Sequence, residues 1–304
     1  MDGEVEFKEG RVGFVTILGR PNVGKSTFVN KALGYHLAAV SRRPNTTRKK
    51  WLGILSDGES QIILVDTPGV HESRNKMQEA MAGTIKTCLE DNDATVCLCD
   101  ATRAFGEEDE RVAAAAASSG KPRFLLINKV DVAREGQVAE MKKRYLDVLK
   151  EVEVFEISAQ EGVGVKEALQ AVKASLPEGP FMYPEDQLTD VIERDVAEEV
   201  IREAANELVY QEVPQSLTVK IDTWKENEKK VRIFATVYLE REAQKPIVIG
   251  ESGKMINAIA KSAREKLRVD LEKFVDVKLS VKVTSDWQNK KRFLKEMGIV
   301  DTTH

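Results

Sequence analysis

The feature that most constrains the fold of this chain is an eight-residue segment, Gly19–Ser26, which reads Gly-Arg-Pro-Asn-Val-Gly-Lys-Ser. An apolar, β-branched run, Val12–Leu18, precedes it, and a helical pattern over Lys25–Leu33 follows. A glycine-rich turn between a strand and a helix, with Gly-Lys-Ser at the helix start, is typical of a phosphate-binding loop. The sequence therefore predicts an α/β domain whose first strand and first helix are joined by this loop.

The residue types in this loop have separate roles in holding a nucleoside triphosphate. Gly19 and Gly24 allow backbone N–H groups to curl around phosphate oxygens, and the helix N-terminus adds a favourable dipole. We expect Lys25 to reach the β- and γ-phosphates and the Ser26 hydroxyl to bind Mg²⁺. The other residues assigned to the same nucleotide-binding loop are Asn22, Val23 and Thr27.

Short apolar runs alternate with longer helical patterns from residue 12 to about residue 176, which predicts a mostly parallel sheet with helices on both faces. Only four residues separate the second and third runs, so we expect these two to form an antiparallel hairpin in a mixed sheet of six strands. The expected strands are Val12–Leu18, Trp51–Ser56, Gln61–Asp66, Ala94–Asp100, Arg123–Asn128 and Val152–Ile157. The expected helices are Lys25–Leu33, Ser73–Glu90, Glu107–Ser119, Arg134–Lys150 and Val165–Leu176.

The chain has 304 residues, which is enough for two domains with separate cores. Residues 177–189 interrupt the alternation with three prolines, so we read them as a linker between a first domain, 1–176, and a second, 190–304. The second domain reads as a smaller α+β unit with the order α-β-β-α-α-β and a terminal helix. Its expected elements are Asp190–Tyr210, Leu217–Asp222, Val231–Leu239, a short run before Gly250, Lys254–Lys273, Val275–Val283 and Asn289–Met297.

Composition narrows the cellular setting. No apolar run approaches the roughly 18 residues that a spanning helix needs, and the start Met1-Asp2-Gly3-Glu4 is acidic where a targeting signal would be basic, so we expect a cytoplasmic protein. The cysteines Cys88, Cys97 and Cys99 are interpreted as reduced core thiols.

The net charge of −4 is not that of an obvious polyanion binder. Residues 241–304 nevertheless carry 14 basic and 9 acidic side chains, and this local excess of positive charge is a weak indication of nucleic-acid binding.

A second segment with functional chemistry, Asp-Thr-Pro-Gly over Asp66–Gly69, ends the third predicted strand. A carboxylate at Asp66 can bind a metal ion, usually through water, and the Gly69 N–H can sense a γ-phosphate. Standing alone, these four residues would be a plain turn as often as a functional one. Their position one hairpin after a phosphate-binding loop favours the metal and switch interpretation.

A third segment, Asn-Lys-Val-Asp over Asn128–Asp131, ends the fifth predicted strand and indicates guanine specificity. The Asp131 carboxylate can accept hydrogen bonds from both the ring N–H and the exocyclic amine of guanine, a pair that adenine lacks. We expect Lys129 to cover the ring and Asn128 to tie the neighbouring loops together. Ser158-Ala159, after the sixth strand, would bring a backbone N–H near the guanine carbonyl. The predicted ligands are GTP and GDP with Mg²⁺.

These four segments, in this order, resemble those of the translation-factor branch of Ras-like P-loop GTPases over residues 12 to about 176. Within this branch, Pro44–Arg48 resembles the switch I segment that supplies a hydroxyl to Mg²⁺. Thr46 and Thr47 could each do so; we favour Thr47, because relatives with a single threonine keep the one directly before the Arg or Gln position. The resemblance implies GTP hydrolysis with Lys25, Thr47 and Gly69 as catalytic residues and Mg²⁺ held by Ser26, Thr47 and Asp66.

One position departs from the Ras pattern. Val70 stands where classical relatives have a glutamine that orients the attacking water, and valine has no hydrogen-bonding group. The chain is similar here to GTPases with a hydrophobic residue, several of which use K⁺ held by a loop asparagine, the place that Asn22 occupies. We therefore hypothesise slow intrinsic hydrolysis assisted by K⁺. His71 follows Val70, and we interpret it as a solvated switch-loop residue, not a general base.

The second domain contains a segment, Ile247–Ile256, that resembles the V-I-G-x-x-G-x-x-I core of a KH domain, and the order α-β-β-α-α-β is that of type II KH folds. In such folds the G-x-x-G loop lies between two helices, where backbone groups approach nucleic-acid phosphates beside a groove for about four bases. The predicted RNA-binding residues are Ile249, Gly250, Glu251, Ser252, Gly253, Lys254, Lys261 and Arg264.

A Ras-like GTPase domain followed by a type II KH domain resembles the Era GTPases, and the stretch Glu240–Lys245 strengthens that resemblance. It implies binding of the 3′ end of 16S rRNA, assistance in assembly of the small (30S) ribosomal subunit, and peripheral association of some molecules with the inner face of the cell membrane. We expect a monomer. Three residues differ from many relatives, Glu251 in the loop and Asn257 and Ala260 after it, which leaves base choice and affinity open.

Four other functions are alternatives to this interpretation. A non-catalytic RNA-binding assembly protein would bind nucleotide without releasing phosphate over many turnovers. A tRNA-modification GTPase requires additional domains, and an ion-transport GTPase requires transmembrane helices. The Asn128–Asp131 segment disfavours a metabolic P-loop kinase.

Overall fold

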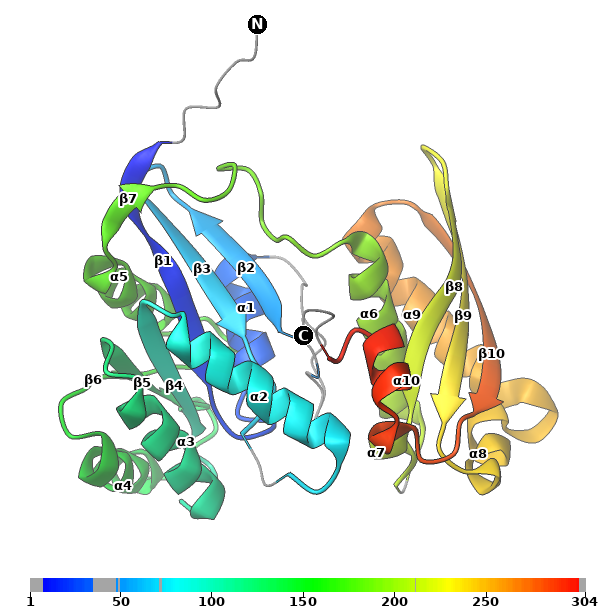
Figure 1. The fold of residues 1–304 in the computed structure, drawn as a ribbon, viewed down its shortest axis with the longest axis horizontal. Helices are drawn as coiled ribbons and strands as arrows, with labels where there is room; N and C mark the ends of the chain where they lie inside the picture. Colours follow the sequence, from blue (N-terminus) through cyan, green and yellow to red (C-terminus); the bar gives the residue numbers. More distant parts are fainter. Residues whose placement is uncertain (1–7, 35–47, 49, 71–72, 211, 301–304) are drawn as a thin grey trace, which may run out of the picture. The chain divides into compact units, whose positions relative to one another are not determined.

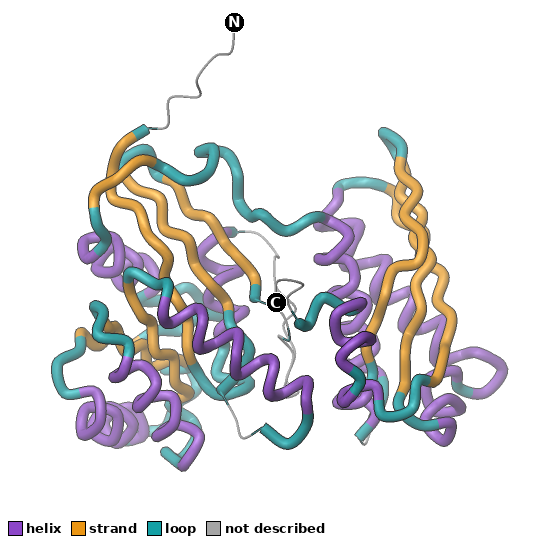
Figure 2. Tube along the Cα trace, viewed as in Figure 1, coloured by secondary structure: helices purple, strands orange, loops and turns teal. Residues whose placement is uncertain are grey.

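The structure is a computed structural model that describes residues 8–34, 48, 50–70, 73–210 and 212–300. These residues form two compact units. The first contains every described residue before 71 together with 82–190, and the second contains 73–81 and 191–300. Figure 2 shows that the strands gather into two sheets, each accompanied by helices.

The first sheet has the strand order β2-β3-β1-β4-β5-β6, a mixed and mostly parallel path of six strands that confirms the fold class predicted from the sequence. β2 and β3 are antiparallel, as the short connection between them requires, and the other neighbours on the path are parallel. The strands are β1 (Glu9–Leu18), β2 (Trp51–Ser56), β3 (Ser60–Asp66), β4 (Ala94–Asp100), β5 (Arg123–Asn128) and β6 (Glu153–Glu156).

Helices cover both faces of this sheet: α1 and α5 lie on one face, and α2, α3 and α4 on the other (Figure 1). Their bounds are α1 (Lys25–Leu33), α2 (Lys76–Glu90), α3 (Glu107–Ser118), α4 (Gln137–Leu149) and α5 (Val165–Ser175). Two of them begin later than predicted. Asn75 Oδ1 accepts a hydrogen bond from the Gln78 N–H at 2.9 Å and caps α2, and α4 follows Gly136, whose φ of 82° is not helical.

The central strands are buried on both faces because helices pack on each side. Every residue of β3 and β4 is buried, which explains their nearly continuous apolar sequences. Cys97 and Cys99 lie in this core at 0% exposure, and burial raises the pKa of both thiols above the usual range. They pack there as small apolar side chains.

Residues 177–189, predicted as a linker, are held against the first sheet. They include the short strand β7 (Glu178–Pro180), which pairs antiparallel with the start of β1. The buried side chain of Gln61 accepts hydrogen bonds from the N–H groups of Met182 and Tyr183 at 2.8 and 2.9 Å and donates to the Tyr183 carbonyl at 2.8 Å. The prolines interrupt the helical pattern, but Gln61 provides main-chain partners for the segment.

The second unit contains a three-stranded sheet in the order β10-β9-β8, with β8 and β9 antiparallel and β9 and β10 parallel. Helices α6 and α9 pack together and against the sheet (Figure 1). This is the predicted α-β-β-α-α-β order with a short extra helix, α7. The bounds are α6 (Glu193–Leu208), α7 (Val213–Ser216), β8 (Thr218–Glu226), β9 (Lys230–Leu239), α8 (Lys245–Ile249), α9 (Lys254–Leu271), β10 (Phe274–Val283) and α10 (Lys291–Glu296).

Candidate functional site

The phosphate-binding loop connects β1 to α1, and its backbone requires glycine at Gly24. The φ of Gly24 is 104°, and a Cβ at this position would lie 2.3 Å from Nδ2 of Asn128. Asn22 also has a left-handed φ, 66°, which asparagine tolerates better than most residues. The loop therefore turns sharply into the N-terminus of α1, where main-chain N–H groups are available to an anion.

Lys25 lies inside this loop at 6% exposure. Its Nζ donates hydrogen bonds to the carbonyl oxygens of Gly19 and Arg20, both at 3.1 Å. Burial lowers the pKa of Lys25 to about 8, although the nearby carboxylate of Asp66 acts in the opposite direction. The cation is thus enclosed by carbonyl oxygens at the position from which the P-loop pattern predicts contact with phosphates.

Two oxygen donors suited to Mg²⁺ meet at the end of β3. Ser26 Oγ donates a hydrogen bond to Asp66 Oδ2 at 2.8 Å, and Asp66 is fully buried. A hydroxyl and a carboxylate in contact are the ligand types that Mg²⁺ uses in P-loop proteins, so this pair fits the predicted ion. Thr46 and Thr47, the candidates for a further ligand, lie outside the described residues, as does His71.

The loop after Asp66 touches the phosphate-binding loop. The buried hydroxyl of Thr67 donates to the Ile17 carbonyl at 2.7 Å, and the Val70 N–H donates to the Gly19 carbonyl at 3.1 Å. A Cβ on Gly69 would lie 2.8 Å from both N and Cγ of Pro21. Only glycine allows this approach, which brings the Gly69 backbone beside the predicted phosphate site.

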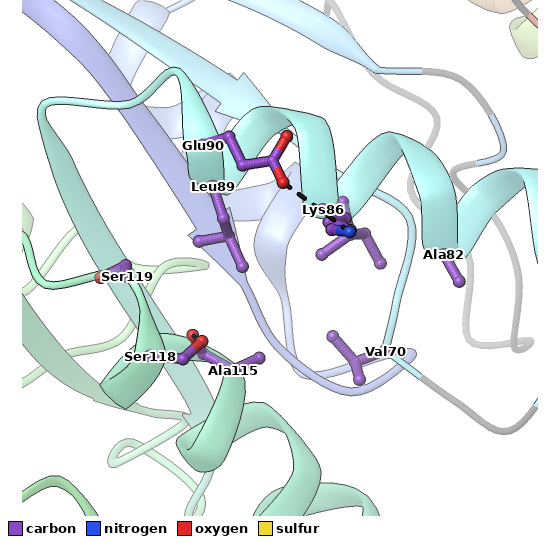
Figure 3. A pocket seen from close by; sticks show the side chains of 9 residues that line it. Val70, Ala82, Lys86, Leu89, Glu90, Ala115, Ser118 and Ser119 are labelled. Atoms are coloured by element: carbon purple, nitrogen blue, oxygen red, sulfur yellow. Dashed lines mark hydrogen bonds and ion pairs between the residues drawn. The ribbon is translucent and has the colours of Figure 1, made fainter.

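Val70 turns its side chain toward the helices. It packs against the apolar core and lines a pocket of about 500 Å³ whose other walls come from α2 and α3, including Ile85, Leu89 and Ala115. Figure 3 shows Val70 at this pocket between the two helices. The residue therefore belongs to an apolar environment and has no group with which to orient water.

The predicted base-binding residues come together at the ends of β5 and β6. Asn128 Nδ2 donates to the Val23 carbonyl at 2.8 Å, and Asn128 Oδ1 accepts from the Ala159 N–H at 2.9 Å. One buried side chain thus joins the phosphate-binding loop to the loop after β6. Beside it is a pocket of about 220 Å³ lined by Gly24, Thr27, Asn128, Lys129, Asp131, Val132, Ser158 and Gln160.

Lys129 is held in place by a residue that the sequence analysis missed, Asp100. Lys129 has a φ of 67°, and its Nζ donates to the Asn22 carbonyl at 3.1 Å and to Asp100 Oδ2 at 2.5 Å. Asp100 is the last residue of β4 and stands opposite Asn128 in the β4–β5 register. A carboxylate at the end of a buried strand was the available signal, because the carboxyl ends of parallel strands meet at one edge.

A second missed group anchors the phosphate-binding loop to α3. Arg20 Nε pairs with Glu108 at 2.9 Å, and Arg20 Nη1 pairs with Asp109 at 2.5 Å. Asp109 is 1% exposed and also accepts a hydrogen bond from the Tyr145 hydroxyl at 2.9 Å. Burial alone would lower the pKa of Arg20, but the two carboxylates outweigh it and raise that pKa. Arg20 therefore stays charged and fixes the second residue of the loop.

In the second unit, the predicted G-x-x-G loop lies between α8 and α9. Gly250 follows α8 with a φ of 72°, and a Cβ there would lie 2.6 Å from the Met255 Cβ. Ser252 and Gly253 also have left-handed φ values, 52° and 79°. Glu251 and Ser252 are exposed, and Ile249 is half-buried at the end of α8. The loop is thus a sharp, accessible connection that leads into the N-terminus of α9.

The basic residues of α9 divide into two kinds. Lys254 and Lys261 are exposed and form loose ion pairs with Glu251 at 3.5 Å and Glu265 at 3.9 Å, which leaves them accessible. Arg264 donates from Nε to the Ala260 carbonyl at 3.2 Å. Lys266, by contrast, contacts Glu203 at 2.6 Å and Glu207 at 2.8 Å on α6, so its role is to join the two helices.

Comparison with known proteins identifies the family. A family model described as a 50S ribosome-binding GTPase matches residues 14–129, and a KH domain model matches residues 212–288. GTPase Era of Staphylococcus haemolyticus is 38% identical over 294 residues, which cover 96% of this chain and 98% of that protein. The chain belongs to the Era family of GTPases.

Two solved structures of this family share the fold. A crystal structure of Aquifex aeolicus Era bound to GDP·AlF4⁻ matches with a TM-score of 0.90 and 34% identity over 96% of this chain and all of that one. A structure of Era in complex with MgGDPNP and nucleotides 1506–1542 of 16S ribosomal RNA matches with a TM-score of 0.91 at the same identity and coverage. The predicted family, fold class and GTPase activity are confirmed. This membership argues against the metabolic kinase alternative.

None of the helices in the described part of the chain is both long and apolar enough to cross a membrane.

Proposed function

We propose that this Era-family GTPase is a switch whose KH unit binds the 3′ end of 16S rRNA and which assists assembly of the 30S subunit. The observation that carries the proposal is the presence, in one chain, of a guanine-type nucleotide site and a strained, accessible G-x-x-G loop. The related Era in complex with nucleotides 1506–1542 of 16S ribosomal RNA supports the choice of RNA. GTP and GDP are the controlling ligands.

The nucleotide chemistry follows from the residues of the first unit. Ser26, Asp66 and Thr47 would hold Mg²⁺, which neutralises phosphate charge when bound, and Lys25 would contact the β- and γ-phosphates. Gly69, packed against Pro21, is the backbone donor that would sense the γ-phosphate. Loss of the γ-phosphate removes these contacts, so the loops are expected to relax after hydrolysis.

Hydrolysis is proposed to be slow and assisted by K⁺ at Asn22, because Val70 lies in an apolar environment and offers no hydrogen bond to water. Phosphate release is measured at equal ionic strength in KCl and in NaCl, for the wild type and for Asn22→Ala. We expect faster turnover in KCl for the wild type and equal rates for the variant. Equal wild-type rates in the two salts would remove K⁺ from the mechanism.

We propose Asp131 as the residue that selects guanine, since it lines the pocket beside Asn128. Asp131→Asn changes an acceptor into a donor, so preference should move from guanosine toward xanthosine nucleotides. Competition between the two diphosphates for a fluorescent nucleotide measures this shift. An unchanged preference would place base selection elsewhere.

The domain organisation proposed here is a GTPase domain over residues 1–176, a linker over 177–189 and a KH domain over 190–304. A monomer in the cytoplasm, with some molecules at the inner face of the membrane, completes the proposal. The sedimentation coefficient measures the oligomeric state, and the fraction of protein that cosediments with lipid vesicles measures membrane association.

RNA binding is tested by fluorescence anisotropy with an oligonucleotide that matches the 3′ end of 16S rRNA and with a scrambled control. The protein carries either a GTP analogue or GDP. Gly253→Asp places a negative charge in the loop, and Gly120→Asp is the matched control, because both glycines have φ near 70° and an added Cβ meets no close contact at either. We expect selective binding that is stronger with the GTP analogue and lost only in Gly253→Asp. Unselective binding, or equal loss in both variants, would refute the RNA proposal.

A further inference from the structure

The sheet of the second unit carries a basic and aromatic surface on the face opposite its core. Alternate residues of β9 point to the core, for example Val231 and Ile233 at 0% and 1% exposure, and those between them point outward. At the end of the sheet near the β8–β9 hairpin, the outward residues of the three strands form one surface, here called the distal face. Its basic and aromatic residues are Lys225, Lys230, Arg232, Phe234, Phe274 and Lys278, and Thr223 and Asp276 lie among them.

Two phenylalanines on the distal face are accessible. Phe234 is 38% exposed and Phe274 is 52% exposed. The Nζ of Lys278, opposite Phe234 in the β9–β10 register, is 5.7 Å from the Phe234 ring centroid. Phe274 is flanked by the Nζ of Lys230 at 4.8 Å and the Arg268 guanidinium at 4.7 Å from its ring centroid. Exposed aromatic rings with cations beside them provide stacking surfaces for bases and charges for phosphates.

The cations of the distal face are available to a ligand. Within the described residues, Lys225, Arg232 and Lys278 make no ion pair within 4.0 Å, whereas Lys273 at the edge of the same sheet is paired with Glu226. Outward carboxylates are fewer: Asp276 lies opposite Arg232 in the register. Asp222 also points outward, and it accepts a hydrogen bond from the Thr236 hydroxyl at 2.7 Å. The surface is therefore positively charged and attracts a polyanion.

We propose that the distal face binds single-stranded RNA, with bases stacked on Phe234 and Phe274 and phosphates contacting Lys225, Arg232 and Lys278. The inference rests on the RNA binding proposed above and adds a second contact region to it. The mixture of charge and exposed rings favours RNA over a protein partner, because a protein-binding core is depleted in charged residues, above all lysine.

The distal face lies at the other end of α9 from the G-x-x-G loop. α9 starts directly after Gly253 and ends three residues before Phe274. Its 18 residues span roughly 27 Å at 1.5 Å per residue, so an RNA held at the loop must extend beyond the groove to reach the distal face. Stacking and phosphate contacts tolerate any sequence, so this region should lengthen and strengthen binding without reading bases.

The test compares a short RNA that fills only the G-x-x-G groove with RNAs that extend it by single-stranded nucleotides at the 5′ or the 3′ end. The variants are Phe234→Ala and the pair Lys225→Glu with Lys278→Glu. The pair Lys121→Glu with Lys143→Glu is the matched control, because these lysines are exposed on the first unit and change the net charge equally. Thermal unfolding of every variant checks folding.

We expect one extended RNA to bind the wild type at least tenfold more tightly than the short RNA. Phe234→Ala should weaken the extended RNA by about fivefold or more, the loss of one stacked base, and leave the short RNA within twofold. The double variant Lys225→Glu with Lys278→Glu should make the negative slope of log affinity against log salt shallower by about 1.4, or about 0.7 for each lost phosphate contact. The control pair should leave that slope unchanged.

Other outcomes are distinguishable. If the short RNA binds but neither extension adds affinity, or if both charge pairs act equally, the distal-face inference is overturned while the G-x-x-G proposal stands. Unchanged affinity of all RNAs in the distal variants would also overturn it and would point to a protein partner at this surface. If the wild type binds neither RNA, the proposed function fails, and the inference fails with it.

Discussion

The P-loop lysine leads to a quantitative prediction for the pH dependence of nucleotide binding. In the structure, burial lowers the pKa of Lys25 to about 8, against 10.5 for an ordinary lysine, and Asp66 opposes the shift. Bound phosphates would place negative charge beside Nζ and return this pKa toward its ordinary range. Between the two pKa values the complex holds a proton that the free protein has lost, so binding takes up a proton there.

The sign and size of the effect follow from this difference. Below pH 8 Lys25 is mostly charged both in the free protein and in the nucleotide complex, so the affinity for GDP is at its full value. As the pH rises through 8 the free protein loses the proton, and binding must restore it at a cost. At pH 9 about one free molecule in eleven keeps a charged Lys25, so GDP affinity should fall about tenfold between pH 7 and pH 9, or ~1.4 kcal/mol.

The assay is titration with a fluorescent GDP analogue at pH 7, 8 and 9 and constant ionic strength, for the wild type and for Lys25→Met. The guanine ring itself loses a proton in alkaline solution, but this affects both proteins, so the difference between their profiles isolates Lys25. Calorimetry in two buffers of different ionisation enthalpy counts the protons. Parallel profiles for the two proteins, or no proton uptake near pH 8.5, would refute the reasoning.

Three substitutions test the geometry of the site. Asn128→Ala removes two buried hydrogen bonds that join three loops, so GDP affinity in a fluorescence titration should fall at least tenfold, about 1.4 kcal/mol or more; a change below threefold would contradict this role. Gly69→Ala forces a Cβ to within 2.8 Å of Pro21, so phosphate release should slow about tenfold or more while GDP affinity changes little, and normal turnover would be the contrary result. Asp109→Asn breaks the pair with Arg20 and should lower the free energy of unfolding in urea by about 2 kcal/mol. This loss is smaller than that expected for a fully buried pair, because the Arg20 side chain is 18% exposed. Unchanged stability would show that the pair is structurally neutral.

The main parts of the nucleotide site could be predicted from the sequence because they are contiguous. In Gly19–Ser26 the spacing of glycines, lysine and serine specifies a backbone turn and the groups on it, and the left-handed φ of Gly24 is a local property of that turn. The G-x-x-G loop was recognisable for the same reason, since Gly250 and Gly253 adopt conformations that few other residues tolerate. The predicted sheet and helices followed from period and length.

The residues that hold these motifs in position could not be found this way, because each acts across a large distance in sequence. Asp100 reaches Lys129 only because β4 and β5 are neighbours in a parallel register. Asp109 meets Arg20 because α3 packs beside the phosphate-binding loop. A charged residue in the printed sequence does not reveal its partner.

The same contrast between contiguous motifs and contacts that are distant in sequence applies to the charged surfaces of the second unit. The sequence by itself determined the two folds, the guanine-type motifs and the glycine loop, because local backbone preference and hydrophobic period act between near neighbours. Only the tertiary structure decided that Lys266 is bound to Glu203 while Lys278 faces solvent beside Phe234, although both lysines lie in similarly basic stretches. The physical reason is that helix packing and strand register, which depend on the whole core, determine which charges are neutralised and which remain available to a ligand.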